Sequence, residues 1–162
     1  MSERIETAAL RDFSVSLCRA AGLSADDAAL LTDSILFAEC RGVTSHGLLR
    51  LPQYIARLRS GATASNVPMP FTMESGGTAR LDAQNGLGQL AGRKASDKAE
   101  ELAAKYGVSF VAVANSNHFG TGAWYAIPAA RRGFFAFNIS SAASAMAPHG
   151  AAQPLLGTDP VG

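Results

Sequence analysis

The spacing of apolar residues changes character near residues 63–70, and this change constrains the fold more than any other feature. Before this proline-bearing segment, apolar side chains recur at helical intervals over residues 5–21, 24–40 and 44–61. After it, short runs containing β-branched residues alternate with a longer amphipathic run, which is the rhythm of strand, helix and strand. We therefore predict an α/β fold, with an N-terminal helical subdomain over residues 1–62 and part of a mixed α/β sheet domain over residues 63–162.

Local signals predict where the helices begin and end. Gly22 ends the first helix, and Ser24 caps the second, with Asp26 and Asp27 in its first turn, where the helix dipole favours negative charge. The third helix begins near residue 44 or 45. Pro52 is expected to interrupt it, because proline lacks the backbone N–H and clashes with the preceding turn.

The second part of the chain reads as layers of strand and helix. We predict strands at residues 78–82, 108–114 and 134–139, and helices at residues 89–105 and about 122–132. The last segment, from residue 154 to 162, stops just after a turn. The strands counted in this way look like part of a sheet, so we expect an open sheet edge with unpaired backbone groups.

Composition excludes several classes of function. The formal net charge is +1, and no basic stripe with interleaved aromatic residues suggests nucleic-acid binding. No apolar run reaches the length of a membrane span, and the N-terminus lacks a signal-peptide pattern. Cys18 and Cys40 lie in predicted helices without metal-ligand spacing, so we expect buried free thiols, a cytoplasmic location and no metal site.

His46 is the most informative single residue. Arg50 follows it by four positions, so a helix would place the imidazole and the guanidinium on the same face. Tyr54 lies another four residues on, beyond the expected kink. Such a stripe can polarise a carbonyl group beside a carboxylate, although an ordinary polar helix face would have the same spacing.

A second histidine, His118, directly follows a predicted strand and precedes Gly120 and Gly122. Loops at the carboxyl ends of strands are where open α/β sheets bind ligands. The alternative is a loop histidine bonded to nearby backbone. His149 lies in a Pro-His-Gly turn, and we interpret it as a turn residue.

Three segments together resemble a known family. They read SHGLLRLPQY at residues 45–54, NSNHFG at 115–120, and APHG at 147–150 followed by LGTDP at 156–160. In this order they resemble the malate/L-lactate dehydrogenase family, which also contains ureidoglycolate dehydrogenase, diketogulonate reductase and cyclic imino-acid reductases. Members are about twice as long as this chain, so it resembles a truncated N-terminal half. The resemblance implies a non-Rossmann homodimer using NAD or NADP, and no G-x-G-x-x-G fingerprint is present here.

The resemblance also implies roles for individual residues. His46 matches a proton donor to the substrate carbonyl, and Arg50 matches the arginine near the substrate carboxylate. His118 matches a second active-site histidine, which has the acid–base role in some members, so which histidine is the main proton donor stays open. The substrate-binding positions are then Ser45, Arg50 and Tyr54. The positions matching the cofactor region are His118, Gly120, Thr121, Pro148, Gly157, Thr158 and Asp159.

The chain departs from the family pattern at two places. Asp159 stands where the family usually has asparagine, and Ser141-Ala142 replaces an expected Asn-Ser pair, which puts a cofactor contact there in doubt.

The implied reaction is hydride transfer between NAD(P)H and a small 2-oxo or 2-hydroxy acid of the malate or lactate type. Residues 115–122 favour the hydroxy-acid members. Residues 148–155 lean towards reductases of pyrroline- or piperideine-2-carboxylate. A third reading is an inactive remnant that serves at most as a binding or dimerisation module.

Overall fold

The computed structural model describes residues 5–142 and 144–162. The chain divides into two compact units, one ending at Thr121 and the other spanning Gly122–Gly162. The predicted boundary after residue 62 falls within the first unit and stays a prediction.

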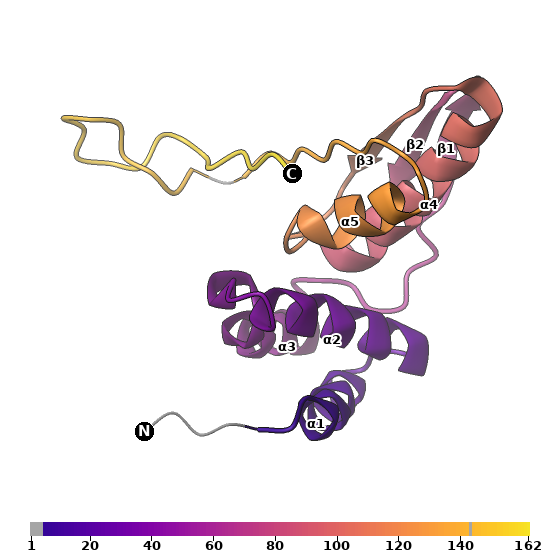
Figure 1. Ribbon diagram of the computed structural model, residues 1–162. Coiled ribbons are helices and arrows are strands. Elements are labelled where there is room, and N and C mark those ends of the chain that lie inside the picture. The colour runs from indigo at the N-terminus through magenta and orange to yellow at the C-terminus, as the bar shows by residue number, and fades with distance from the viewer. Residues whose placement is uncertain (1–4, 143) are drawn as a thin grey trace. The chain divides into compact units, whose positions relative to one another are not determined.

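Three helices open the first unit: α1 (Thr7–Ala20), α2 (Ala25–Glu39) and α3 (Leu51–Arg59) (Figure 1). The predicted cap of α2 is confirmed, because the Ser24 Oγ accepts a hydrogen bond of 3.1 Å from the Asp27 backbone N–H. Leu31 and Ile35 of α2 are buried in a cluster that also contains Leu51 and Tyr54 of α3. Burial of this shared apolar face holds the three helices together.

The segment between α2 and α3 corrects the prediction of one long, kinked helix. Two short 3₁₀ turns, Thr44–His46 and Leu48–Arg50, precede α3, with Gly47 between them. Glu39 accepts a 2.9 Å hydrogen bond from the Leu48 backbone N–H, and a side chain at Gly47 would overlap this carboxylate. Pro52 lies in the first turn of α3, where a missing N–H costs no intrahelical hydrogen bond, so it starts the helix instead of breaking it.

A three-stranded sheet forms the rest of the first unit, in the order β1 (Phe71–Ser75), β2 (Thr78–Asp82) and β3 (Phe110–Ala114). β1 and β2 are antiparallel, whereas β2 and β3 are parallel and are joined through α4 (Gly88–Tyr106). Leu81 of β2 packs with Ala91 and Ala95 of α4 in a second core cluster. The predicted α/β class is confirmed.

Two features of this sheet bear on the predictions. β1 was not predicted, because four of its five residues are exposed and it carries no alternating apolar pattern. β3 has a neighbour on one side within the described sheet, and Phe110 on it is exposed. β1 is likewise an edge strand, so the predicted unfinished sheet edge stays a prediction.

The second unit contains α5 (Ala123–Arg131), which confirms the helix predicted at about 122–132. Pro128 lies inside this helix. The predicted strand at residues 134–139 is wrong. Its segment forms an isolated bridge, Ile139 to Val161, flanked by reciprocal 2.8 Å hydrogen bonds between Asn138 and Gly162. A strand persists through an extended ladder, and the described residues supply no such ladder here.

The cysteines differ from each other. Cys18 is buried, as predicted, and burial raises the pKa of its thiol. Cys40 is exposed at the C-terminal end of α2, so the expectation that both thiols are buried is wrong for this residue. No helix among the described residues combines the length and apolar character needed to cross a membrane.

Candidate active site

Two histidines far apart in the sequence meet in the first unit. His46 belongs to the 3₁₀ turn before α3, and His118 lies in the loop that follows β3. Their imidazole rings stack with centroids 5.3 Å apart and an interplanar angle of 27°. This convergence brings together the two segments that sequence patterns singled out independently.

Tyr54 joins this pair from α3. Its side chain is 4% exposed, and its hydroxyl lies 2.7 Å from the His118 Nδ1. The Gln89 Nε2, from the first turn of α4, donates a 2.7 Å hydrogen bond to the same hydroxyl. Burial raises the pKa of Tyr54 to about 12, so this group stays a neutral hydroxyl at physiological pH.

Ser45 and Arg50 complete the group, although in a geometry that differs from the predicted helix. The Ser45 Oγ lies 2.9 Å from the His46 Nδ1, and the Arg50 Nε donates a 2.7 Å hydrogen bond to the Ser45 carbonyl. His46 and Arg50 belong to separate 3₁₀ turns, so the predicted i, i+4 helical stripe is wrong. The guanidinium nevertheless acts on His46, because its charge contributes to lowering the pKa of that imidazole.

The electrostatics keep both histidines neutral at physiological pH. Burial, followed by the charges of Arg50 and His46, lowers the pKa of His118 to about 4, although part of the side chain is exposed. Burial and then Arg50 lower the pKa of His46. The site therefore combines a fixed positive charge with two neutral imidazoles, a combination that attracts an anion.

The loop that carries His118 is held by close backbone approach and by side-chain amides. A Cβ atom at Gly88, the first residue of α4, would overlap the carbonyls of Asn117 and His118. The Asn117 Nδ2 donates to the Gly86 carbonyl at 3.0 Å, and its Oδ1 accepts from Arg57 at 2.9 Å. α3 and α4 thus fix the loop from two sides.

Two of the predicted cofactor residues follow in the same loop. Gly120 has a φ of 81°, a conformation that favours glycine. The Thr121 hydroxyl is buried and has no hydrogen-bond partner among the described residues. A buried unpaired hydroxyl suits a carboxamide such as that of nicotinamide, so these residues fit the cofactor that the sequence resemblance implies.

The remaining predicted cofactor residues lie in the second unit. The Pro148 carbonyl accepts a 2.9 Å hydrogen bond from the Ala151 N–H, which closes the turn containing His149, as interpreted from the sequence. The Asp159 Oδ1 accepts a hydrogen bond of 2.9 Å from the Ala142 backbone N–H. A Cβ atom at Gly157 would overlap the Ala142 carbonyl. Asp159 therefore anchors the neighbouring chain segment. The cofactor roles of Pro148, Gly157, Thr158 and Asp159 stay predictions.

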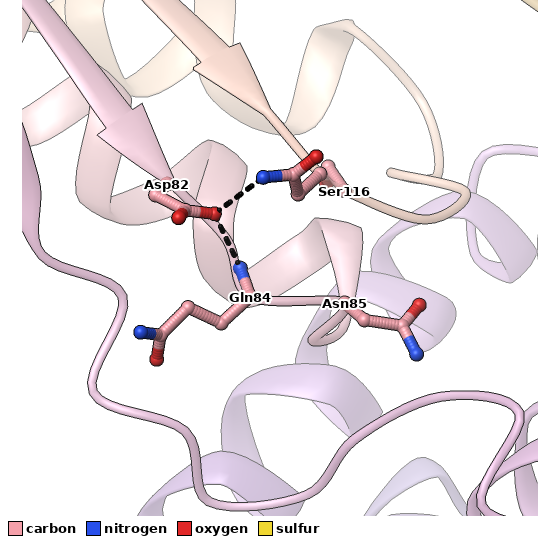
Figure 2. A pocket seen from close by; sticks show the side chains of 5 residues that line it. Asp82, Gln84, Asn85 and Ser116 are labelled. Carbon is pink, nitrogen blue, oxygen red and sulfur yellow. Dashed lines mark hydrogen bonds between the residues drawn. The ribbon is translucent and has the colours of Figure 1, made fainter.

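A polar hollow lies at the carboxyl ends of β2 and β3, lined by Asp82, Gln84, Asn85, Asn115 and Ser116. Figure 2 shows Asp82 beside the Gln84 backbone, to which it is hydrogen-bonded at 3.0 Å. Asn115 donates to the same carboxylate oxygen at 2.9 Å, and these bonds lower the pKa of Asp82. The hollow contains none of the predicted site residues.

Gln89 is the site residue that sequence reasoning missed. It is 1% exposed and touches the catalytic candidates through Tyr54. Its sequence signal is a polar residue directly after Gly86-Leu-Gly88, where small residues allow the helix start to approach a loop closely. Among the described residues, no group of three or more His, Cys, Asp and Glu side chains could hold a metal ion.

Comparison with known proteins decides the family. The family described as malate/L-lactate dehydrogenase matches residues 5–162. The chain belongs to this family. The resemblance inferred from the three sequence segments is thus confirmed.

Individual members of the malate/L-lactate dehydrogenase family match over most of this chain. A malate dehydrogenase of Pyrococcus abyssi is 35% identical over 158 residues, 98% of this chain and 44% of that protein. An L-sulfolactate dehydrogenase of Methanocaldococcus jannaschii is 37% identical over 140 residues, 86% of this chain and 41% of that protein. The solved malate dehydrogenase of Pyrococcus horikoshii aligns with a TM-score of 0.93 at 31% identity, covering 98% of this chain and 46% of that one. The chain therefore spans less than half the length of these relatives.

Proposed function

We propose that the protein acts in NAD(P)-dependent hydride transfer to and from a small 2-oxo or 2-hydroxy acid of the malate or lactate class. The observation that supports this most directly is the stacked pair His46 and His118 beside Arg50. A 2-oxo acid needs a proton source at its carbonyl oxygen and a cation at its carboxylate, and this arrangement offers both. We further propose a cytoplasmic location and a homodimeric state. Light scattering on the purified protein measures the oligomeric state.

Arg50 is placed to hold the substrate carboxylate. Its Nε is bonded to the Ser45 carbonyl, and its Nη1 donates a 3.0 Å hydrogen bond to the Gln53 Oε1. Nη2 has no partner among the described residues, so the edge formed by the two Nη atoms can bind both carboxylate oxygens. A bidentate pair of this kind fixes orientation as well as affinity.

His46 is the proposed proton donor to the carbonyl oxygen, with the Ser45 hydroxyl at its Nδ1 orienting the ring. Reduced nicotinamide, when bound, supplies the hydride to the carbonyl carbon. Gly120 and Thr121, together with His118, are the residues of the first unit that we propose to lie against the nicotinamide. We propose Pro148, Gly157, Thr158 and Asp159 as further cofactor-binding residues, on the family resemblance alone.

Isothermal titration with NADH and with NADPH, followed by an absorbance assay of reduced-cofactor oxidation, tests the proposal. We expect binding of at least one cofactor and turnover with oxaloacetate, pyruvate or sulfopyruvate. Faster turnover with Δ1-piperideine-2-carboxylate would assign the protein to cyclic imino-acid reduction instead. Absence of both binding and turnover, in a protein shown by circular dichroism to be folded, would favour a binding or dimerisation module.

Replacing Arg50 with lysine tests the carboxylate clamp. A point charge would then replace the planar fork, so we expect the KM for the 2-oxo acid to rise roughly tenfold or more. The Kd for the cofactor should change little. Arg59→Lys, at the exposed end of α3, is the matched control and should behave as the unmodified protein. An unchanged KM in Arg50→Lys would contradict the clamp.

A further inference from the structure

Gln89 occupies an unusual place for a glutamine. It lies in the first turn of α4, is 1% exposed, and bonds to the Tyr54 hydroxyl at 2.7 Å. Its Oε1 is also buried and has no partner among the described residues. A fully buried amide with one end bonded to the site and the other unpaired suggests a role beyond packing.

The bonds from Gln89 through Tyr54 to His118 form a chain that can run in either direction. In one direction the amide donates to the tyrosine oxygen, and the hydroxyl proton then goes to His118 Nδ1. In the other, the His118 Nδ1–H donates to the tyrosine, which donates to the amide oxygen. Either direction leaves one end of the amide unpaired, so Gln89 alone does not decide between them.

The Gly120 backbone favours the first direction. Its N–H donates to the same His118 Nδ1 at 3.4 Å, and a backbone N–H cannot act as an acceptor. A proton on Nδ1 would face this N–H, whereas an unprotonated Nδ1 accepts from both Gly120 and Tyr54. These two contacts favour the neutral imidazole with its proton on Nε2.

We propose that Gln89 is a positioning residue: its amide, bonded to the Tyr54 oxygen, acts together with the Gly120 N–H to keep the Tyr54 hydroxyl proton directed at Nδ1, and so holds His118 as the neutral Nε2–H tautomer. This inference rests on the proposed function for its catalytic meaning. A neutral imidazole with Nε2–H donates a hydrogen bond but does not readily give up its last ring proton. His118 then stabilises negative charge that develops on the substrate oxygen, and transfer of the proton is left to His46.

The charges around His118 also favour a neutral ring. Arg50 and His46 face it from the segment before α3, and both disfavour a positive charge on its ring. Tyr54 of α3 faces it as a neutral hydroxyl, and the neutral amide of Gln89 from α4 is connected to it through Tyr54. Protonation of Nδ1 would therefore oppose two donors and a nearby guanidinium.

Nuclear magnetic resonance of the ¹⁵N-histidine-labelled protein, without cofactor or substrate, tests the proposal directly. Long-range ¹H–¹⁵N correlation spectra distinguish the two neutral tautomers of each histidine. For His118 we expect the Nε2–H form to dominate at neutral pH. In Gln89→Met, which keeps the length of the side chain but has no donor, we expect a mixture of both tautomers. The pKa of His118 should also rise by roughly one unit, since the freed hydroxyl can accept from a protonated Nδ1.

Two further variants separate positioning from packing. Gln153→Met, at an exposed position of the second unit, makes the same chemical change elsewhere and should leave the His118 signals unchanged. In a Tyr54→Phe background the relay is already broken, so adding Gln89→Met should cause no further change in the tautomer ratio. A dominant Nδ1–H form in the unmodified protein, or an unaltered His118 spectrum in Gln89→Met, would overturn the proposal. Because the spectra need no turnover, failure here is distinct from absence of hydride transfer.

Discussion

Replacing His46 with alanine should lower kcat for reduction of the 2-oxo acid by roughly 10²–10⁴-fold, the usual contribution of a positioned acid or base. The cofactor Kd should stay close to that of the unmodified protein, because the proposed cofactor residues lie in other segments. His149→Ala is the matched control, since this histidine is exposed in a turn of the second unit. Equal turnover in His46→Ala and His149→Ala would remove His46 from the reaction.

The rates of reduction and oxidation should depend on pH in opposite directions. Reduction needs the protonated imidazole of His46, and burial together with Arg50 lowers the pKa of that group from its ordinary value of 6.5. The kcat/KM for reduction should therefore fall as pH rises through a value below 6.5. Oxidation of the hydroxy acid needs the neutral imidazole and should rise over the same interval. If His46→Ala lost this change of kcat/KM with pH, the titrating group would be His46. If the change persisted, another group would be responsible.

The features that could be predicted from sequence are those decided by local chemistry. Ser24 caps α2 because its hydroxyl is the nearest acceptor for an unpaired N–H, and Gly107 ends α4 in the left-handed conformation that glycine adopts without strain. The meeting of His46 and His118 was also anticipated. It required recognising two separate segments as parts of one family pattern, since periodicity alone left an ordinary polar face open for each.

The features that were missed depend on tertiary context. Pro52 is compatible with a kink inside a helix and with the first turn of a helix. Because Glu39 accepts a hydrogen bond from the Leu48 N–H, the chain breaks at Gly47 and Pro52 lies in the first turn of α3. The apolar run at residues 134–139 has strand composition, but a ladder requires a neighbour, which no local signal provides. Gln89 looked like an ordinary polar residue near a helix start. Its burial follows from the close approach of α4 to the His118 loop.

That close approach is what Gly88→Ala should disrupt. A Cβ atom at this position would overlap backbone carbonyls of Asn117 and His118, and backbone held by Arg57 and the Asn117 amide cannot yield as a flexible side chain would. We expect the loop to move by a fraction of an ångström or more, which lengthens the 2.7 Å contact between His118 and Tyr54. Misplacement of about 1 Å can cost about 10²-fold in rate, so kcat should fall by about that factor.

The stability of Gly88→Ala provides an independent check, because two effects of opposite sign compete. Replacing glycine by alanine in a helix ordinarily stabilises a protein by about 0.4–1 kcal/mol, since the unfolded chain loses conformational freedom. Overpacking against fixed backbone typically costs about 1–3 kcal/mol, which is the larger effect. Chemical denaturation should therefore show a net loss of stability, together with altered His118 resonances. A more stable variant with unchanged kcat would mean that the His118 loop yields without affecting the site, and that α4 does not position it.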